Sequence, residues 1–278
     1  MTVEQIRVTT GWLDLREPAD AAARCGELAD RLRRHLPKVG PWVIHDLACG
    51  TGAMGRWLAP LLPAPQLWVL HDRDADLLEV AAADLPGPAA DGSPVAVETG
   101  LSDVTRLEAA ELFGASLITA SALLDLLTED ELVGLVELLA AAVGPPALLT
   151  LSVTGRVRLA PRHPLDARVV AAFNAHQRRT TWSGRLLGPD AVARVVDEFR
   201  RRGAEVVVRP SLWRLGPNEA ELAAEWFSGW LGAACEQDAA LAAQAGAYER
   251  TRLAQASAGQ LAVTVDHADL LVLPGGSR

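Results

Sequence analysis

The sequence predicts a doubly wound α/β fold on a seven-stranded, mostly parallel sheet, with helical additions near both ends of the chain. From residue 42 onward, short apolar runs alternate with helical segments, a pattern typical of a parallel sheet with helices on both faces. The 278 residues are 50% hydrophobic, so the chain can bury one large core, alone or with a smaller appendage.

The N-terminal region is predicted to be helical. Apolar residues at helical spacing predict an amphipathic helix over residues 18–36, which Pro37 ends. We therefore interpret residues 1–40 as a helical cap. Residues 41–278 are expected to form the main domain, which carries substrate-covering insertions at 152–188 and 211–257.

The alternation in the main domain predicts each element in turn. Strands are expected at residues 42–48, 66–71, 94–98, 116–120 and 147–151, with helices at 53–62 and 74–83. A further helix begins at Thr128, because Thr128 and Glu131 have the spacing of a capping box. The insertion at 152–188 then interrupts the alternation with two loops around a helix near residues 165–179.

The C-terminal third resumes the alternation. Gly188-Pro189-Asp190 starts a helix that stops at Gly203, before a strand at 204–209. Two more helices over 217–257 precede a last strand within 261–273. The first of these two helices carries an apolar stripe that we interpret as core: Leu222, Trp226, Phe227, Trp230 and Leu231.

Composition narrows the classes of partner. The net charge of −9 argues against nucleic acid and favours a small-molecule substrate. No Cys-x-x-Cys pair or metal-ligand cluster is present, so no metal is expected. The opening residues 1–5 lack the order of a signal peptide, and no run of about 18 apolar residues occurs, so we expect a cytoplasmic protein without a membrane span. The sequence does not indicate the oligomeric state.

The segment VIHDLACGTG, residues 43–52, carries the chemistry. An apolar strand runs into a turn where Gly50 and Gly52 permit positive φ and close approach of a ligand, and a helix N-terminus follows. About 20 residues later the second strand ends at Asp72, which is placed to accept the hydroxyls of a ribose. These features predict a nucleoside site at the carboxyl ends of the strands.

Asp46 distinguishes between two classes of nucleoside cofactor. The glycine spacing also fits a dinucleotide fingerprint, but a carboxylate two residues before the turn would repel a pyrophosphate. A cationic amino group would be favoured there. Asp46 thus argues against a nicotinamide-dependent dehydrogenase.

Residues 42–151 resemble the class I methyltransferases, whose first motif is approximately Asp-x-Gly-x-Gly-x-Gly. Asp46 takes the acidic place, Gly50 and Gly52 the last two glycines, and Ala48 stands where the first glycine is usual. The resemblance implies a Rossmann-like methyltransferase sheet and S-adenosylmethionine as cofactor. Ala48 departs from the pattern by one methyl group, which narrows the room beside the methionine moiety.

Three later segments resemble further motifs of the family. LWVLHDRDADLLEVAAAD implies that Asp72 binds the ribose hydroxyls and that Arg73 lies beside the adenine. SDVTRL implies that Asp103 lies near the adenine amino group and the Val104 amide near a ring nitrogen. LITASALLDLLT implies that the methionine end is lined by Thr119, Ala120 and Ser121.

Each carboxylate also has a local structural explanation. Asp46 can satisfy backbone amides of the turn, Asp72 can cap the helix that begins near Asp74, and Asp103 can be a turn aspartate. The order and spacing of the three together favour the cofactor site.

Methyl transfer requires alignment of the acceptor and, for a hydroxyl, a proton acceptor. The candidate catalytic residues are His176, on the insertion helix, and Asp125, after the fourth strand. The alternative for His176 is that it packs against or caps the insertion helix. The alternative for Asp125 is that it is a polar residue without a catalytic role, just before a helix cap. The resemblance implies a methyltransferase acting on an oxygen, nitrogen or carbon of a small molecule. The alternatives are a protein that binds S-adenosylmethionine or S-adenosylhomocysteine without methyl transfer, and an rRNA or protein methyltransferase.

Overall fold

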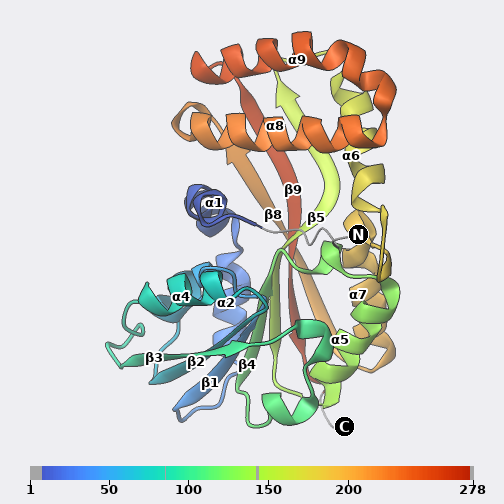
Figure 1. Ribbon diagram of the computed structural model, residues 1–278. Coiled ribbons are helices and arrows are strands. Elements are labelled where there is room, and N and C mark those ends of the chain that lie inside the picture. The colour runs from blue at the N-terminus through green and yellow to red at the C-terminus, as the bar shows by residue number, and fades with distance from the viewer. Residues whose placement is uncertain (1–7, 85, 142–143, 276–278) are drawn as a thin grey trace.

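The computed structural model describes residues 8–84, 86–141 and 144–275, and the opening residues considered for a signal peptide lie outside them. Seven strands form one sheet in the order β3-β2-β1-β4-β5-β9-β8 (Figure 1). The pairings within β3-β2-β1-β4-β5 are parallel, and β9 runs antiparallel to both of its neighbours. The predicted doubly wound, mostly parallel sheet is confirmed.

The expected strands are all present, and four of them, β2, β3, β5 and β8, are longer than expected. The seven strands are β1 Trp42–Leu47, β2 Gln66–Asp72, β3 Val95–Leu101, β4 Leu117–Ser121, β5 Ala147–Ala160, β8 Glu205–Leu215 and β9 Ala262–Leu273. Between β5 and β8 a short hairpin pairs β6 Thr180–Thr181 with β7 Gly184–Arg185.

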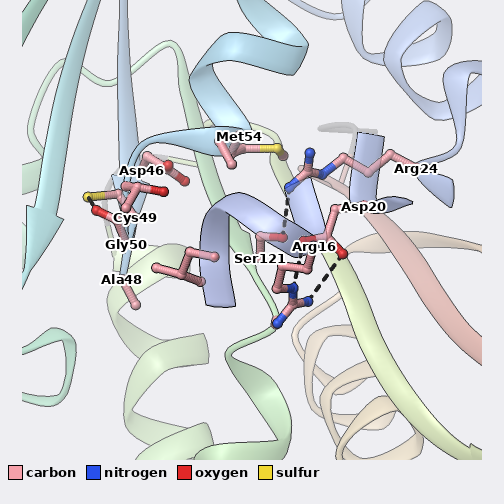
Figure 2. Close-up of a pocket in the computed structure, with 13 residues that line it drawn as sticks. Arg16, Asp20, Arg24, Asp46, Ala48, Cys49, Gly50, Met54 and Ser121 are labelled. Atoms are coloured by element: carbon pink, nitrogen blue, oxygen red, sulfur yellow. Dashed lines mark hydrogen bonds and ion pairs between the residues drawn. The ribbon is translucent and has the colours of Figure 1, made fainter. Parts of the chain in front are cut away.

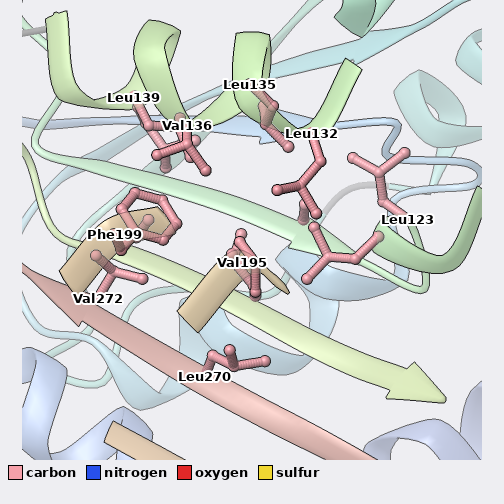
Figure 3. Packing of buried hydrophobic residues seen from close by; sticks show 14 of the residues in the cluster. Leu123, Leu132, Leu135, Val136, Leu139, Val195, Phe199, Leu270 and Val272 are labelled. Carbon is pink, nitrogen blue, oxygen red and sulfur yellow. The ribbon is translucent and has the colours of Figure 1, made fainter. Parts of the chain in front are cut away.

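Helices cover both faces of the sheet. One face is covered by α2 Gly26–Arg33, α3 Ala53–Leu58 and α4 Ala75–Ala83, and the other by α5 Glu129–Ala141 and α7 Ala191–Arg201. Adjacent strand residues therefore enter different cores: Leu148 packs with the α2–α4 layer and Leu149 with the α5–α7 layer. Burial on both faces explains why these strands are apolar at nearly every position. Figure 3 shows α5 and α7 packed on β9.

A third core lies beyond the end of the parallel sheet. There β5, β8 and β9 continue upward and carry α6 Asp166–Gln177, α8 Ala220–Gln237 and α9 Ala239–Ser257 (Figure 1). The apolar stripe predicted on the first C-terminal helix belongs to this core, with Phe227 and Trp230 almost fully buried. None of the described helices is both long enough and apolar enough to cross a membrane.

Two expectations about boundaries are wrong. The helix expected over 18–36 is two helices, α1 Thr10–Ala23 and α2, because the backbone N–H of Cys25 donates to Asp269 Oδ2 at 2.7 Å instead of continuing the first helix. Residues 152–160 form strand and not loop, because β5 keeps pairing with β9 past two register shifts. The interruption between β5 and α7 thus begins after Ala160.

Candidate functional site

The glycine turn after β1 has the left-handed backbone that the sequence predicts. Gly50 has φ +56° and Gly52 has φ +84°. A side chain at residue 50 would also approach Leu13 of α1 to 3.3 Å, so glycine is needed for space as well as conformation. Ala48 has φ +52°, which explains why glycine is usual at this place: alanine adopts this conformation only with strain.

A buried cavity of about 70 Å³ lies between this turn, the end of β4 and α1 (Figure 2). The strand and turn side supplies Asp46, Ala48, Cys49, Gly50, Thr51, Ala53, Met54, Ser121 and Ala122, and α1 with the residue after it supplies Leu13, Arg16, Asp20 and Arg24. By the same measure one water needs about 10–15 Å³, so the cavity has room for a small polar headgroup.

Asp46 is the buried acid of this cavity, with 1% of its surface exposed. Thr119 Oγ1 donates to Asp46 Oδ1 at 2.7 Å, whereas Asp46 Oδ2 is buried without a hydrogen-bond partner among the described residues. Burial raises the pKa of Asp46 to about 7, partly offset by the Thr119 hydrogen bond and the charge of Arg24. An unsatisfied buried carboxylate is a costly group, and a cationic ligand would relieve that cost.

The two arginines at the cavity differ in their pairing. Arg16 donates to Asp20 through Nε at 2.9 Å and Nη2 at 3.2 Å, and Trp213 Nε1 also donates to Asp20 Oδ1 at 2.8 Å. Arg24 is 6% exposed, and its Nη2 donates to Ser121 Oγ at 3.3 Å. Its Nε and Nη1 are buried and have no hydrogen-bond partner among the described residues.

The residues predicted to bind the adenosine part of the cofactor lie outside this cavity. Asp72 accepts the Gly50 N–H at 2.8 Å on Oδ2 and the Asp74 N–H at 3.0 Å on Oδ1, so it fixes the glycine turn against the end of β2. Asp103 accepts from the Thr105 amide and hydroxyl at 3.0 and 2.8 Å, as a turn aspartate would. Each carboxylate oxygen can accept a second hydrogen bond, so these roles leave ribose or adenine binding open.

The other residues predicted at the cofactor site are dispersed around it. Gly52 caps α3, Arg73 is exposed after β2, and Val104 begins the short 3-10 helix Val104–Arg106 and packs against the α5–α7 core. Ala120 is 3% exposed and belongs to the same core. Of the residues expected at the end of β4, Ser121 lines the cavity, together with its neighbour Ala122.

The two candidate catalytic residues lie in different environments. Asp125 is half-buried in the 3-10 helix Leu124–Leu126 after β4; burial raises its pKa to about 6, and the positive charge of Arg16 partly offsets that rise. His176 lies in the layer formed by α6, α8 and α9, which we call the upper helical layer. Its Nε2 pairs with Glu236 of α8 at 3.1 Å. Neither residue lines the cavity, but Asp125 responds to an arginine that does.

Sequence reasoning missed the contribution of α1. The expected helix begins at residue 18 and therefore leaves out Leu13 and Arg16. The four-residue spacing of Arg16 and Asp20 was the available signal, since it predicts an ion pair on one helix face. No local pattern indicates that this face covers the glycine turn.

Comparison with solved structures identifies the fold. The cyclopropane synthase MmaA2 from Mycobacterium tuberculosis aligns over 95% of this chain and 94% of its own, with a TM-score of 0.50 and 12% sequence identity. The chain has the Rossmann-like methyltransferase fold. At 12% identity the likeness extends to the fold alone.

Other solved structures align with lower TM-scores. Phosphoethanolamine N-methyltransferase 2 from Haemonchus contortus is 14% identical with a TM-score of 0.47, and the present chain covers 57% of its length. Geranyl diphosphate C-methyltransferase from Streptomyces coelicolor is 11% identical with a TM-score of 0.44, over 87% of this chain and 79% of that one. No family model and no curated protein sequence matches the chain.

Proposed function

We propose that this protein is an S-adenosylmethionine-dependent methyltransferase that acts on a small molecule. One observation carries the proposal: the buried carboxylate of Asp46, at the first turn of a methyltransferase fold, has an oxygen without a partner. The α-ammonium of a methionine moiety would supply the missing donor and the compensating charge. The cavity beside the turn suits such a headgroup in size.

The rest of the cofactor would lie outside the cavity, along the carboxyl ends of β1, β2 and β3. Asp72 and Asp103 retain the capacity to accept further hydrogen bonds there, which supports contacts with ribose and adenine. Bound S-adenosylmethionine would supply an electrophilic methyl group on a sulfonium.

Within this proposal Asp125 is the proton acceptor. Its raised pKa of about 6 lets it receive a proton near neutral pH, and it lies within electrostatic reach of Arg16 at the cavity. His176 is the weaker candidate because it is already paired with Glu236 in the upper helical layer. The net charge of −9 supports a small acceptor over rRNA.

Calorimetric titration of S-adenosylhomocysteine tests the cofactor assignment. Wild type is expected to bind it, and Asp46→Asn is expected to weaken binding at least thirtyfold, because the ammonium loses its counter-charge while Thr119 keeps its hydrogen bond to Oδ1. Binding of NADH in place of S-adenosylhomocysteine would overturn the assignment.

Turnover of labelled S-adenosylmethionine with a panel of phenols, amines and carboxylic acids tests methyl transfer. Asp125→Asn is expected to lower turnover of a hydroxyl acceptor by one hundredfold or more, while S-adenosylhomocysteine affinity stays within threefold of wild type. Binding without transfer to any member of the panel would favour a non-catalytic binding protein.

A further inference from the structure

Arg24 stands at the break between α1 and α2, and the fold holds it there by its backbone. Its own N–H donates to Asp20 O at 3.0 Å and ends α1, and the next N–H, of Cys25, donates to Asp269 Oδ2 at 2.7 Å. Ser211 Oγ donates to the carbonyl of Ala23 at 3.0 Å. The residue is thus fixed from three sides, before any contact of its side chain is considered.

The guanidinium is held in one orientation. Its central carbon lies 5.5 Å from the centroid of the Trp57 ring, and Nη2 donates to Ser121 Oγ at 3.3 Å (Figure 2). This position costs free energy, because Nε and Nη1 are removed from water without gaining an acceptor among the described residues. Burial accordingly lowers the pKa of Arg24.

Of the charged side chains that line the cavity, one arginine and one aspartate pair with each other, and one cation and one anion remain. Arg16 and Asp20 satisfy each other through two hydrogen bonds, and Asp20 is further bound by Trp213. Arg24 and Asp46 remain, each nine-tenths or more buried and each with unpartnered polar atoms. They line the same cavity of about 70 Å³. A ligand that satisfies both must carry an anion and a cation within one small headgroup.

We propose that Arg24 binds the α-carboxylate of the cofactor, so that the α1–α2 junction and the glycine turn together recognise a zwitterion. This inference rests on the proposed function and adds its carboxylate partner. A guanidinium directs its N–H donors toward carboxylate oxygens from a rigid plane, which a lysine cannot reproduce. The site therefore discriminates against a nucleoside that keeps the amine and lacks the carboxylate.

A cycle of ligands and variants tests this assignment by calorimetry. The ligands are S-adenosylhomocysteine and its decarboxylated analogue, and the variants are Arg24→Met and Arg24→Lys. Wild type is expected to prefer S-adenosylhomocysteine at least thirtyfold. Arg24→Met is expected to reduce that preference to threefold or less by weakening S-adenosylhomocysteine alone, and Arg24→Lys to give an intermediate value.

Arg209→Met is the matched control. Arg209 of β8 makes a two-hydrogen-bond ion pair with Glu27 of α2, at 2.7 and 2.9 Å, and so holds the same N-terminal segment from outside the cavity. This variant is expected to keep the wild-type preference between the two ligands. If it lost the preference as Arg24→Met does, the position of the segment and not the guanidinium would be responsible, and the proposal would be wrong.

The possible outcomes distinguish a failure of the Arg24 assignment from a failure of the proposed function. Binding of neither nucleoside by wild type would overturn the proposed function, and the role of Arg24 with it. Wild-type binding of S-adenosylhomocysteine without preference over the decarboxylated analogue would overturn the role of Arg24 alone. Equal weakening of both ligands by Arg24→Met would show that Arg24 only neutralises the buried acids around it. The wild-type comparison is decisive even if Arg24→Met does not fold.

Discussion

Arg252 in the upper helical layer and Arg24 in the cavity are both buried, at 1% and 6% exposure, yet their surroundings differ. Arg252 donates through Nη1 to the carbonyl of Pro161 at 2.7 Å and to Gln255 at 2.8 Å, and through Nη2 to Asp166 Oδ1 at 2.6 Å. Tyr248 completes this cluster by donating to Asp166 at 2.5 Å. Among the described residues, Nε is the one nitrogen of the Arg252 guanidinium without a hydrogen-bond partner, whereas Arg24 has two such nitrogens.

Backbone strain also differs between the cavity and the layer of α6, α8 and α9. Ala48 and Ala122, which line the cavity, have φ +52° without being glycine, whereas no non-glycine residue of α6, α8 or α9 has positive φ. The helical layer pairs the charge of its buried arginine and keeps relaxed backbone, although Arg252 Nε, Trp230 Nε1 and Gln177 Oε1 have no hydrogen-bond partner among the described residues. The cavity leaves the charges of Arg24 and Asp46 without an ion pair among the described residues, and its backbone is strained. Groups that the fold leaves unsatisfied are what a ligand can satisfy, so the contrast separates a structural arginine from a ligand-binding one.

The largest expected effect is the loss of the Arg252 cluster. Arg252→Met is expected to lower the free energy of unfolding by about 3–5 kcal/mol, because Asp166 would be left with its charge uncompensated. Arg24→Met, which removes two unsatisfied donors, is expected to change it by about 1 kcal/mol or less. Urea unfolding at pH 8 measures both. Equal losses would remove the distinction between the two arginines.

Asp46→Asn is expected to stabilise the ligand-free protein. The pKa of Asp46 is about 7 in the folded chain and 3.8 for an ordinary aspartate, so the folded state binds the proton more tightly. The wild type therefore loses stability as pH rises from about 4 to 7, by up to about 4 kcal/mol at 1.4 kcal/mol per pKa unit.

The asparagine variant carries no such penalty. Its advantage in unfolding free energy is expected to be full above pH 7 and absent below about pH 4. Urea unfolding at pH 5, 6, 7 and 8 tests this, and an advantage independent of pH would contradict the assigned pKa. If the variant gains stability and loses S-adenosylhomocysteine binding, Asp46 serves ligand binding at the expense of stability.

Ala48→Gly is the smallest expected effect. Relief of the left-handed strain costs some chain entropy in return, so the net gain in unfolding free energy is expected to be about 0.5–1 kcal/mol. Ala243→Gly, at an exposed position within α9, is the matched control and should lose about 1 kcal/mol. A loss at Ala48 as well would mean that the turn is not strained there.

Local pattern was sufficient for the sheet and for the glycine turn. The alternation of apolar runs with helical segments predicted where the seven strands lie along the chain, and the Thr128 and Glu131 capping box is present, with hydrogen bonds of 2.8 and 3.3 Å. The turn was predictable because Gly50 and Gly52 report a backbone conformation directly. These features depend on residues close in the chain.

The boundaries and partners depended on contacts between distant residues. The break between α1 and α2 is set by Asp269, 244 residues away from Cys25, and the extension of β5 is set by its pairing with β9. Neither Asp269 nor β9 can be identified as a partner from the sequence around Cys25 or β5. Of the residues expected at the methionine end, Ser121 lines the cavity, and Ala122, which no local pattern indicates, lines it as well.

The sequence by itself determined the fold class and the acidic glycine turn, because hydrophobic periodicity and positive φ are encoded within a few residues. Only the tertiary structure decided which charges are paired. Arg16 and Arg24 are both arginines near the N-terminus, but the packing of α1 over the turn gives one of them Asp20 and leaves the other facing the cavity of Asp46. Pairing depends on distance and burial in three dimensions, which no local pattern specifies.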